Sequence, residues 1–439
     1  MLLEAVNFNV DIKTFRHFGF VKNVKGLLIE ASTLHNNIKI GSLALIFSEN
    51  NTVKKAEVIG FNSNTAYLML FDSQNGIYIN QKVEYLNSEL AVTPHESWQG
   101  RVIDCFANPI DDKGPLIQGR ETISIHRKAP DAMKRNLVAG KIDLGVRSLN
   151  VFLTCCKGQR MGIFAGSGVG KSILMSMITK YTNLDIIVIG LVGERGREVQ
   201  EFLQQSLGEE GLKKAIVIVA TSADSALSKK QAAYLTVTIA EFFASLGKDV
   251  LCMIDSVTRF AMAQREIGLA IGEPPTTKGY PPSVFVEMPA LLERTGPTIG
   301  KGSITGIFTV LVEGDDDNEP VSDTTRGILD GHIVLDRNLA NQGLLPAVNI
   351  LKSVSRTMPG CNNNHENEIV TTARRHLANY YNMEELIKIG AYKKGSNPEI
   401  DEAIFYYKKL FDFLKQKPNE KSTLSESYQQ LENILQMKE

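Results

Sequence analysis

No stretch constrains this chain more than residues 165–172, which read AGSGVGKS. An apolar run at 161–164 precedes the stretch, and the mostly apolar run ILMSMI at 173–178 follows it. This order predicts a strand, a tight glycine-rich loop and a helix. The first turn of a helix offers unpaired N–H groups and the positive end of its dipole, and glycines let the backbone wrap closely around an anion. The stretch therefore predicts a phosphate-binding loop.

Within this loop, the final Gly-Lys-Ser carries the chemistry. We expect Lys171 to reach the outer phosphates of a nucleotide and the Ser172 hydroxyl to contact Mg²⁺. Ala165 replaces the glycine that usually opens the motif, which is a small change because the other end does the chemistry. The alternative is a glycine-rich turn with a surface lysine, and the strand–loop–helix context argues against it. The candidate nucleotide-binding residues are Gly166, Ser167, Gly168, Val169, Gly170, Lys171 and Ser172.

Composition limits the classes of partner. The chain has 439 residues, enough for about two or three domains. Its formal net charge of −1 gives no basic field to attract nucleic acid or anionic lipid. The five cysteines have no CxxC spacing, so we expect neither a disulfide framework nor a zinc site. Without a bilayer-length apolar run or a signal-peptide pattern, we expect a cytoplasmic protein with at most peripheral docking onto a membrane-bound machine.

The apolar pattern predicts three parts. Residues 1–92 are rich in β-branched residues broken by Gly, Asn and Ser, which predicts a small β-barrel. Residues 93–360 begin with a looser connector to about residue 150 and then alternate apolar strands and helices, which predicts an α/β domain with a mostly parallel sheet. Residues 361–439 predict a C-terminal helical domain. Expected sheet strands are 185–190, 215–220, 250–254 and 306–311, and expected C-terminal helices are 366–380, 383–389, 399–415 and 422–437.

Two carboxylates follow predicted strands of the sheet. Asp255 ends an apolar strand on the side where ligands bind, so it is a candidate to hold Mg²⁺ or its water; a helix N-cap is the alternative. Glu194 can polarise water for in-line attack on a γ-phosphate, and Arg195 can counter the charge of the transition state. For Arg197 and Glu198 we favour a solvated, salt-bridged helix start.

Arg356 is a further candidate. Phosphoryl transfer places negative charge on the equatorial oxygens, and an arginine from a neighbouring chain can neutralise it. From its own surroundings, Arg356 is an ordinary arginine after a strand-like segment. The acidic cluster at 313–320 reads as a solvated loop rather than a cation site.

Motifs along most of the chain match one family. They are residues 158–172, 193–198, 255–259, 279–283, 314–316, 328–335 and 390–401. Together they resemble the ATPases of type III protein export, and most closely the flagellum-specific ATPase, a relative of the catalytic subunits of rotary ATP synthases. The resemblance runs from about residue 95 to 410 and is most specific at 158–172 and 328–337.

This resemblance implies a central RecA-like P-loop domain and a homohexamer that binds ATP and Mg²⁺ at its subunit interfaces. By motif position, Lys171 and Ser172 bind phosphate and Mg²⁺, Asp255 is the Walker B carboxylate and Glu194 activates water. Arg356 becomes the arginine finger that acts on the neighbour's nucleotide. Implied partners are export-gate membrane proteins, a regulatory stator-like protein, export substrates and chaperones, at the cytoplasmic face of the inner membrane.

The sequence also departs from the family. Leu345 precedes Pro346-Ala347, where the family often has an aromatic residue that packs on adenine; leucine offers packing but no π-face. Asn349 replaces a usual aspartate. The N-terminal extension, which in relatives binds the stator-like protein, is short here.

Four other functions fit parts of the pattern: an injectisome-type secretion ATPase, a rotary synthase catalytic subunit, a nucleic-acid motor and a nucleotide-binding module without turnover. A complete site plus Arg356 in one chain favours a homo-oligomer over a synthase subunit with a non-identical partner. Near-zero net charge and the lack of an aromatic-basic stripe argue against the motor. Glu194 argues against the silent module, although Leu345 keeps it open. Residues 165–172 lean towards the flagellum without deciding between it and the injectisome.

Overall fold

The computed structural model describes residues 16–33, 38–48, 52–300, 302–312 and 319–437. It contains two compact units, one of Met1–Leu90 with Ala270–Gly272 and one of Ala91–Leu269 with Glu273–Glu439. The domain boundaries expected after residues 92 and 360 stay predictions. The first dozen residues and most of the acidic cluster lie outside the described residues.

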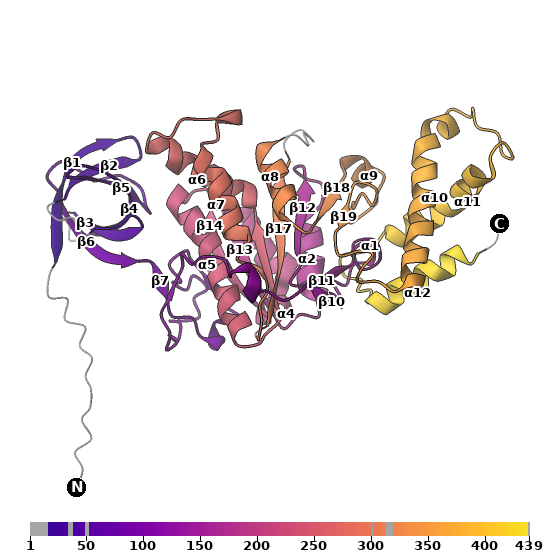
Figure 1. The fold of residues 1–439 in the computed structure, drawn as a ribbon, viewed down its shortest axis with the longest axis horizontal. Helices are drawn as coiled ribbons and strands as arrows, with labels where there is room; N and C mark the ends of the chain where they lie inside the picture. Colours follow the sequence, from indigo (N-terminus) through magenta and orange to yellow (C-terminus); the bar gives the residue numbers. More distant parts are fainter. Residues whose placement is uncertain (1–15, 34–37, 49–51, 301, 313–318, 438–439) are drawn as a thin grey trace, which may run out of the picture. The chain divides into compact units, whose positions relative to one another are not determined.

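The first unit is a closed antiparallel β-barrel, as the sequence predicted (Figure 1). Alternate side chains point inward along each strand, and Ile29, Ile46 and Leu68 are among its fully buried core. The strands are β1 (His17–Lys25), β2 (Leu28–Ser32), β3 (Ser42–Phe47), β4 (Val53–Asn62), β5 (Thr65–Leu70) and β6 (Lys82–Glu89). Their order around the barrel is β1-β2-β5-β4-β3-β6.

The second unit is built on a sheet whose strands run parallel except for β19 at one end and β16, which pairs with β17 off the main path. The order is β19-β18-β12-β17-β15-β13-β14-β8, with β19 antiparallel to β18. The strands are β8 (Val102–Ile103), β12 (Arg160–Ala165), β13 (Ile186–Glu194), β14 (Ala215–Thr221), β15 (Val250–Asp255), β17 (Ser303–Leu311), β18 (Gly331–Leu335) and β19 (Val354–Ser355). Central strands are buried almost throughout, which explains their continuous apolar sequence.

Helices cover this sheet and short strands surround it (Figure 1). Gly190 in β13 permits a close contact with α5, because a Cβ there would lie 2.4 Å from the hydroxyl oxygen of Thr236. The helices are α1 (Arg147–Phe152), α2 (Lys171–Tyr181), α3 (Gly196–Glu201), α4 (Gly208–Lys213), α5 (Ala226–Ser245), α6 (Val257–Ala270), α7 (Pro282–Leu292), α8 (Pro320–Ile328) and α9 (Arg337–Asn341). The short strands are β7 (Ala91–Val92), β9 (Ile123–Ser124), β10 (Ala139–Ile142), β11 (Cys155–Lys157) and β16 (Gly296–Pro297).

The C-terminal part is helical, as predicted, and consists of α10 (Asn364–Lys388), α11 (Pro398–Leu414) and α12 (Leu424–Leu435). One difference concerns α10, which is continuous where we expected separate helices at 366–380 and 383–389. No glycine or proline interrupts this stretch, and the stacked rings of Tyr380 and Tyr407, with centroids 3.5 Å apart, hold α10 against α11.

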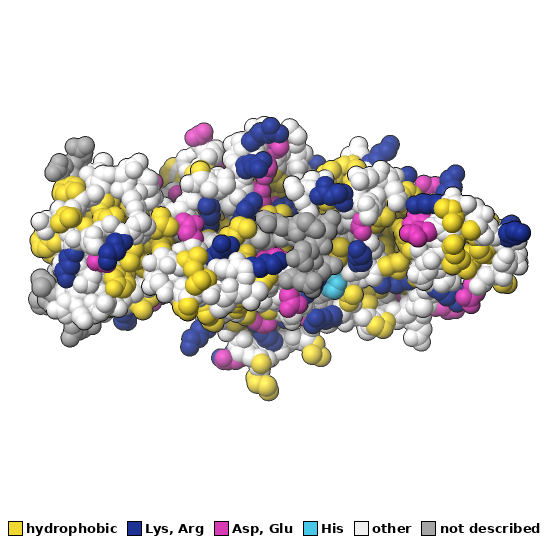
Figure 2. Space-filling view, turned by 90° about the horizontal axis from the view of Figure 1, so that it is seen from above, with side chains coloured by type: hydrophobic (Ala, Val, Ile, Leu, Met, Phe, Trp, Pro, Cys, Tyr) yellow, Lys and Arg dark blue, Asp and Glu magenta, His cyan; other side chains and the backbone are white. Residues whose placement is uncertain are grey.

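The surface carries both signs of charge. On the face shown in Figure 2, Lys and Arg side chains are interspersed with Asp and Glu. None of the helices in the described ranges combines the length and apolar character that a bilayer-spanning segment requires.

Candidate nucleotide-binding site

The glycine-rich loop lies between the carboxyl end of β12 and the start of α2, where the sequence placed it. Gly168 and Gly170 have φ angles of 78° and 97°, a backbone region that side chains with a Cβ rarely adopt. Gly170 is also the N-cap of α2 and gives no side-chain cap, so the first N–H groups of the helix remain available to an anion.

Lys171, the first residue of α2, brings two acidic strand ends together. Its Nζ lies 2.5 Å from Asp255 Oδ1 at the end of β15 and 3.4 Å from Glu194 Oε1 at the end of β13. Burial alone would lower the pKa of Lys171, but the two carboxylates outweigh this effect and hold the pKa above its ordinary value. The lysine is therefore a fixed positive charge at the mouth of the loop.

Glu194 is held in a setting that favours its protonated form. Burial, followed by the negative charge of Asp255, raises the pKa of Glu194 to about 7, although Lys171 opposes this shift. A carboxyl group that titrates near neutral pH is suited to exchange protons with water during a reaction.

Asp255 has a second donor that the sequence analysis did not identify. The Thr309 hydroxyl on β17 donates a 2.6 Å hydrogen bond to Asp255 Oδ1, because β17 lies beside β15 in the sheet. Both residues are buried. The sequence signal for this hydrogen bond is a threonine within the apolar run GIFTVL. A hydroxyl that is buried with such a strand requires a hydrogen-bond partner.

Lys171 and Glu194 border a cavity of about 860 Å³. Arg259 on α6 also lines it, packed so closely that a Cβ on Gly193 would lie 2.7 Å from the Arg259 Cβ. Arg337 at the start of α9 lines it too, and its Nη2 donates to the Ser167 carbonyl oxygen at 3.0 Å. Sequence reasoning assigned neither arginine a role, yet both add positive charge beside the phosphate loop.

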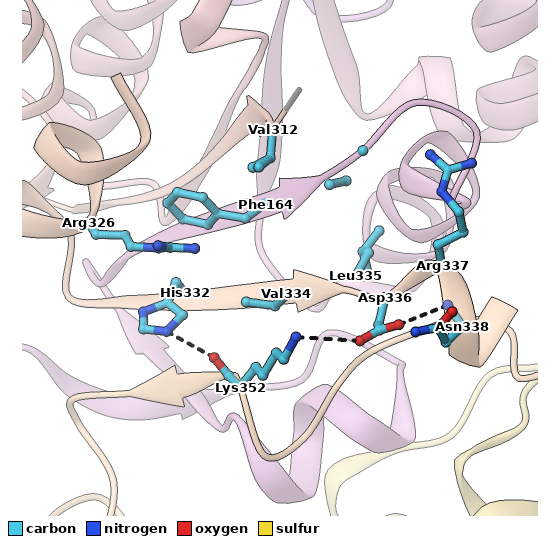
Figure 3. Close-up of a pocket in the computed structure, with 12 residues that line it drawn as sticks. Phe164, Val312, Arg326, His332, Val334, Leu335, Asp336, Arg337, Asn338 and Lys352 are labelled. Carbon is cyan, nitrogen blue, oxygen red and sulfur yellow. Dashed lines mark hydrogen bonds and ion pairs between the residues drawn. The ribbon is translucent and has the colours of Figure 1, made fainter. Parts of the chain in front are cut away.

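A second cavity of about 590 Å³ adjoins the first and shares Gly166, Val312 and Arg337 with it (Figure 3). The Arg326 guanidinium lies 4.7 Å from the centre of the Phe164 ring. The His332 ring bonds to the Lys352 carbonyl oxygen at 3.1 Å, and Lys352 Nζ lies 3.9 Å from the Asp336 carboxylate.

The remaining candidates lie in different places. Arg195 is at the rim of the larger cavity, with 81% of its side chain exposed and a loose 3.7 Å contact to Glu198. Leu345 lies against the loop, because a Cβ on Gly170 would be 3.6 Å from its Cδ2. Ser172, at the first turn of α2, lines the cavity.

Arg356 is remote from the loop of its own chain. Ser355 pairs with Gly331 at the start of β18, whereas Ala165, which leads into the loop, pairs with Leu335 at the other end. Four residues of strand separate these levels by about 13 Å. Arg356 continues away from the loop, and its Nη2 donates to the Arg326 carbonyl oxygen at 3.2 Å.

Comparison with known proteins identifies the family. The flagellum-specific ATP synthase of Caulobacter vibrioides is 50% identical over 95% of this chain and 96% of its own length. That of Bacillus subtilis is 51% identical, over 96% of both chains. The chain belongs to the flagellum-specific ATP synthase family. Residues 145–355 match the nucleotide-binding domain of the ATP synthase alpha/beta family, and residues 363–433 match the C-terminal domain of type III secretion EscN ATPases.

Solved structures agree with this membership. The chain matches the assembled type III secretion ATPase EscN of enteropathogenic E. coli with a TM-score of 0.89 at 40% identity, covering 95% of this chain and all of that one. EscN in complex with its central stalk EscO gives a TM-score of 0.87. The fold predicted from sequence, with a barrel, an ATPase domain and C-terminal helices, is therefore confirmed as that of an ATP-hydrolysing P-loop enzyme.

Proposed function

We propose that this protein hydrolyses ATP with Mg²⁺ and thereby energises protein export through a flagellar type III apparatus. The observation that carries the proposal is the convergence of Lys171, Glu194 and Asp255 at the glycine-rich loop. The flagellar relatives, at about half identity over nearly the whole chain, favour the flagellum over the injectisome.

The residues fit a Mg-nucleotide. The loop amides and Lys171 bind the β- and γ-phosphates, and the ion, when bound, neutralises charge that develops on the phosphate oxygens. The Ser172 hydroxyl and the Asp255 carboxylate are hard oxygen donors of the kind that Mg²⁺ prefers, and Thr309 orients that carboxylate. Lys171 then exchanges its ion pair with Asp255 for the phosphates.

Glu194 is the residue we assign to the attacking water. Its ionised form accepts a hydrogen bond from the water and orients it for in-line attack on the γ-phosphorus. Arg195 at the rim and Arg259 within the cavity supply positive charge near the transferred group. Leu345 forms the apolar wall on the other side of the loop.

Because Arg356 lies far from its own loop, we propose that it serves the nucleotide of an adjacent subunit in a homohexamer. The assembled form of EscN and its complex with a central stalk support an oligomer with a stalk-type partner. Export-gate proteins, a stator-like regulator, chaperones and cargo are the further partners we propose, at the cytoplasmic face of the inner membrane.

Phosphate release tests the proposal directly. We expect hydrolysis that requires Mg²⁺, that Lys171→Ala abolishes, and that Lys180→Ala leaves intact, because Lys180 is an exposed lysine at the opposite end of the same helix. In cells whose own copy is replaced, Lys171→Ala should also stop export of flagellar proteins. Undiminished turnover by folded Lys171→Ala would rule out the assigned site.

A further inference from the structure

Two cysteines that lie far apart in the sequence meet where the C-terminal helices begin. Cys156 belongs to β11, which precedes the strand of the phosphate loop, and Cys361 lies in the turn before α10. Their side chains form a hydrogen bond in which the Cys156 thiol donates to the Cys361 sulfur. All five cysteines of the chain are free, so both members of this pair are reduced thiols.

Hydrogen bonds from neighbouring residues hold the two segments side by side. Gln159 Oε1 accepts from the Cys156 backbone N–H and from the Thr357 hydroxyl, both at 2.9 Å. The Cys361 backbone N–H donates to the Thr357 carbonyl oxygen at 2.9 Å, which closes a turn over Thr357. The Thr357 hydroxyl contacts both sulfur atoms. The thiol pair is therefore positioned by the surrounding backbone and not by two flexible side chains alone.

The two thiols differ in access. Cys156 is 1% exposed, whereas Cys361 is partly exposed and can meet a small solute. Lys141 is the cross-strand partner of Cys156 on β10, and its Nζ lies 2.6 Å from Glu366 Oε2 in the first turn of α10. The hydrogen bond from Cys156, together with the positive charge of Lys141, outweighs burial and lowers the pKa of Cys361 to about 7. At neutral pH much of Cys361 is therefore thiolate, which is the nucleophilic form of cysteine.

The adjacent Cys155 provides an internal comparison. Successive side chains of a strand point to opposite faces, so Cys155 and Cys156 point apart. Cys155 is packed into the main apolar core of the second unit, and burial raises its pKa to about 12. On β11, Cys156 is therefore the residue that can react with Cys361.

We propose that Cys361 and Cys156 form a modification site for hydroperoxides, in which Cys361 is oxidised and Cys156 converts the product to a disulfide. The Cys361 thiolate attacks one oxygen of hydrogen peroxide, so that a sulfur–oxygen bond forms and the oxygen–oxygen bond breaks. The other oxygen leaves as hydroxide and becomes water with the proton that Cys361 gave up.

The second step consumes the sulfenic acid. The Cys156 sulfur attacks the Cys361 sulfur, the sulfur–sulfur bond forms and the sulfur–oxygen bond breaks. The departing hydroxide takes the Cys156 proton and leaves as water. Two thiols together lose two electrons, and one hydrogen peroxide is reduced to two molecules of water.

The disulfide ties the turn before α10 to β11 by a covalent bond. Cys361 follows Arg356 by five residues, so the bond closes next to the segment that begins at the proposed arginine finger. Thiol–disulfide exchange reopens such a bond in a reducing compartment, so the modification is reversible.

Peptide mass spectrometry of the full-length protein tests this proposal. The reduced protein is treated with hydrogen peroxide, denatured, alkylated and digested with trypsin, which places Cys156 in fragment 148–157 and Cys361 in fragment 357–374. We expect the two fragments as one disulfide-linked species that a dithiol reductant separates. Fragment ions assign the link to Cys156 rather than to Cys155.

Variants separate the two roles. Cys361→Ser should form no cross-link, and Cys156→Ser should leave Cys361 as a sulfenic acid that dimedone labels. Cys105→Ser is the matched control and should cross-link like the parent, because Cys105 is buried elsewhere in the fold. In the parent, Cys361 should react at least about tenfold faster than Cys105, whose pKa is raised to about 12 by burial.

The parent protein alone can refute the inference. A Cys361 that reacts no faster than Cys105, a disulfide between Cys155 and Cys156, or an oxidised Cys361 without a link to Cys156 would each overturn it. These results do not depend on the folding of any variant or on ATP hydrolysis.

Discussion

Mixing two inactive variants decides whether Arg356 acts on its own subunit's nucleotide or on a neighbour's. Lys171→Ala removes the phosphate-binding lysine but retains the arginine finger Arg356. Arg356→Ala retains the phosphate-binding loop and removes the arginine finger. Each alone should be inactive, since an arginine finger is worth about 10³–10⁵ in kcat. The separation of Ser355 from the level of Ala165, about 13 Å along the strands, exceeds the reach of an arginine side chain.

The expected recovery follows from simple statistics. In a ring assembled at random from equal amounts of the two variants, half of the subunits carry an intact Lys171 and half of the neighbouring subunits carry an intact Arg356. About one quarter of the shared sites are therefore complete. Phosphate release should therefore return to roughly a quarter of the parent value, after the two variants have been refolded together or allowed to exchange subunits. If the finger acted within its own chain, no subunit would be complete and no activity would return.

The mixing experiment has an internal control. Lys171→Ala mixed with the double variant Lys171→Ala, Arg356→Ala contains no intact loop, so it should stay inactive under either arrangement. Co-purification of two differently tagged variants shows that mixed oligomers form. No recovery in demonstrably mixed, folded oligomers would refute the shared site.

Two further predictions concern the acidic residues. Because the pKa of Glu194 is raised to about 7, its ionised form is lost as pH falls below neutrality, so kcat/KM should decline about tenfold per pH unit below 7. Glu210→Gln, a substitution of an exposed glutamate, should leave this pH profile unchanged. A flat pH profile between about pH 5.5 and 7 would contradict the role of Glu194. Thr309→Val removes one hydrogen bond to Asp255, worth about 1 kcal/mol, so half-maximal activity should require about fivefold more Mg²⁺. Thr305→Val on the same strand should not change this requirement, and an unchanged Mg²⁺ requirement in Thr309→Val would exclude the orienting role.

The parts of the site that the sequence predicted are those set by local pattern. Glycines around Lys171 fix a loop between a strand and a helix, and apolar runs that end in Glu194 and Asp255 place both carboxylates at one edge of a parallel sheet. No long-range information is required for this inference, because parallel strands share one carboxyl edge.

The parts that the sequence did not predict depend on contacts between distant segments. Thr309 meets Asp255 across 54 positions, and Arg337 meets Ser167 across 170. The register between strands and the packing of α9 decide such contacts, and a periodic pattern does not encode them. The continuous α10 has a similar cause, since tertiary packing sustains a helix where propensity alone indicated a break.

Gln416 also has a mechanical consequence. Its backbone and side chain connect the end of α11 to Leu345, Gly145 and Arg147 through several hydrogen bonds at once. Each bond contributes about 1 kcal/mol, and they must break together for α11 to move independently of the wall beside the loop. A force applied to the C-terminal helices therefore reaches the wall beside the loop through Gln416 together with neighbouring links such as the Arg147–Lys415 and Tyr181–Pro418 hydrogen bonds.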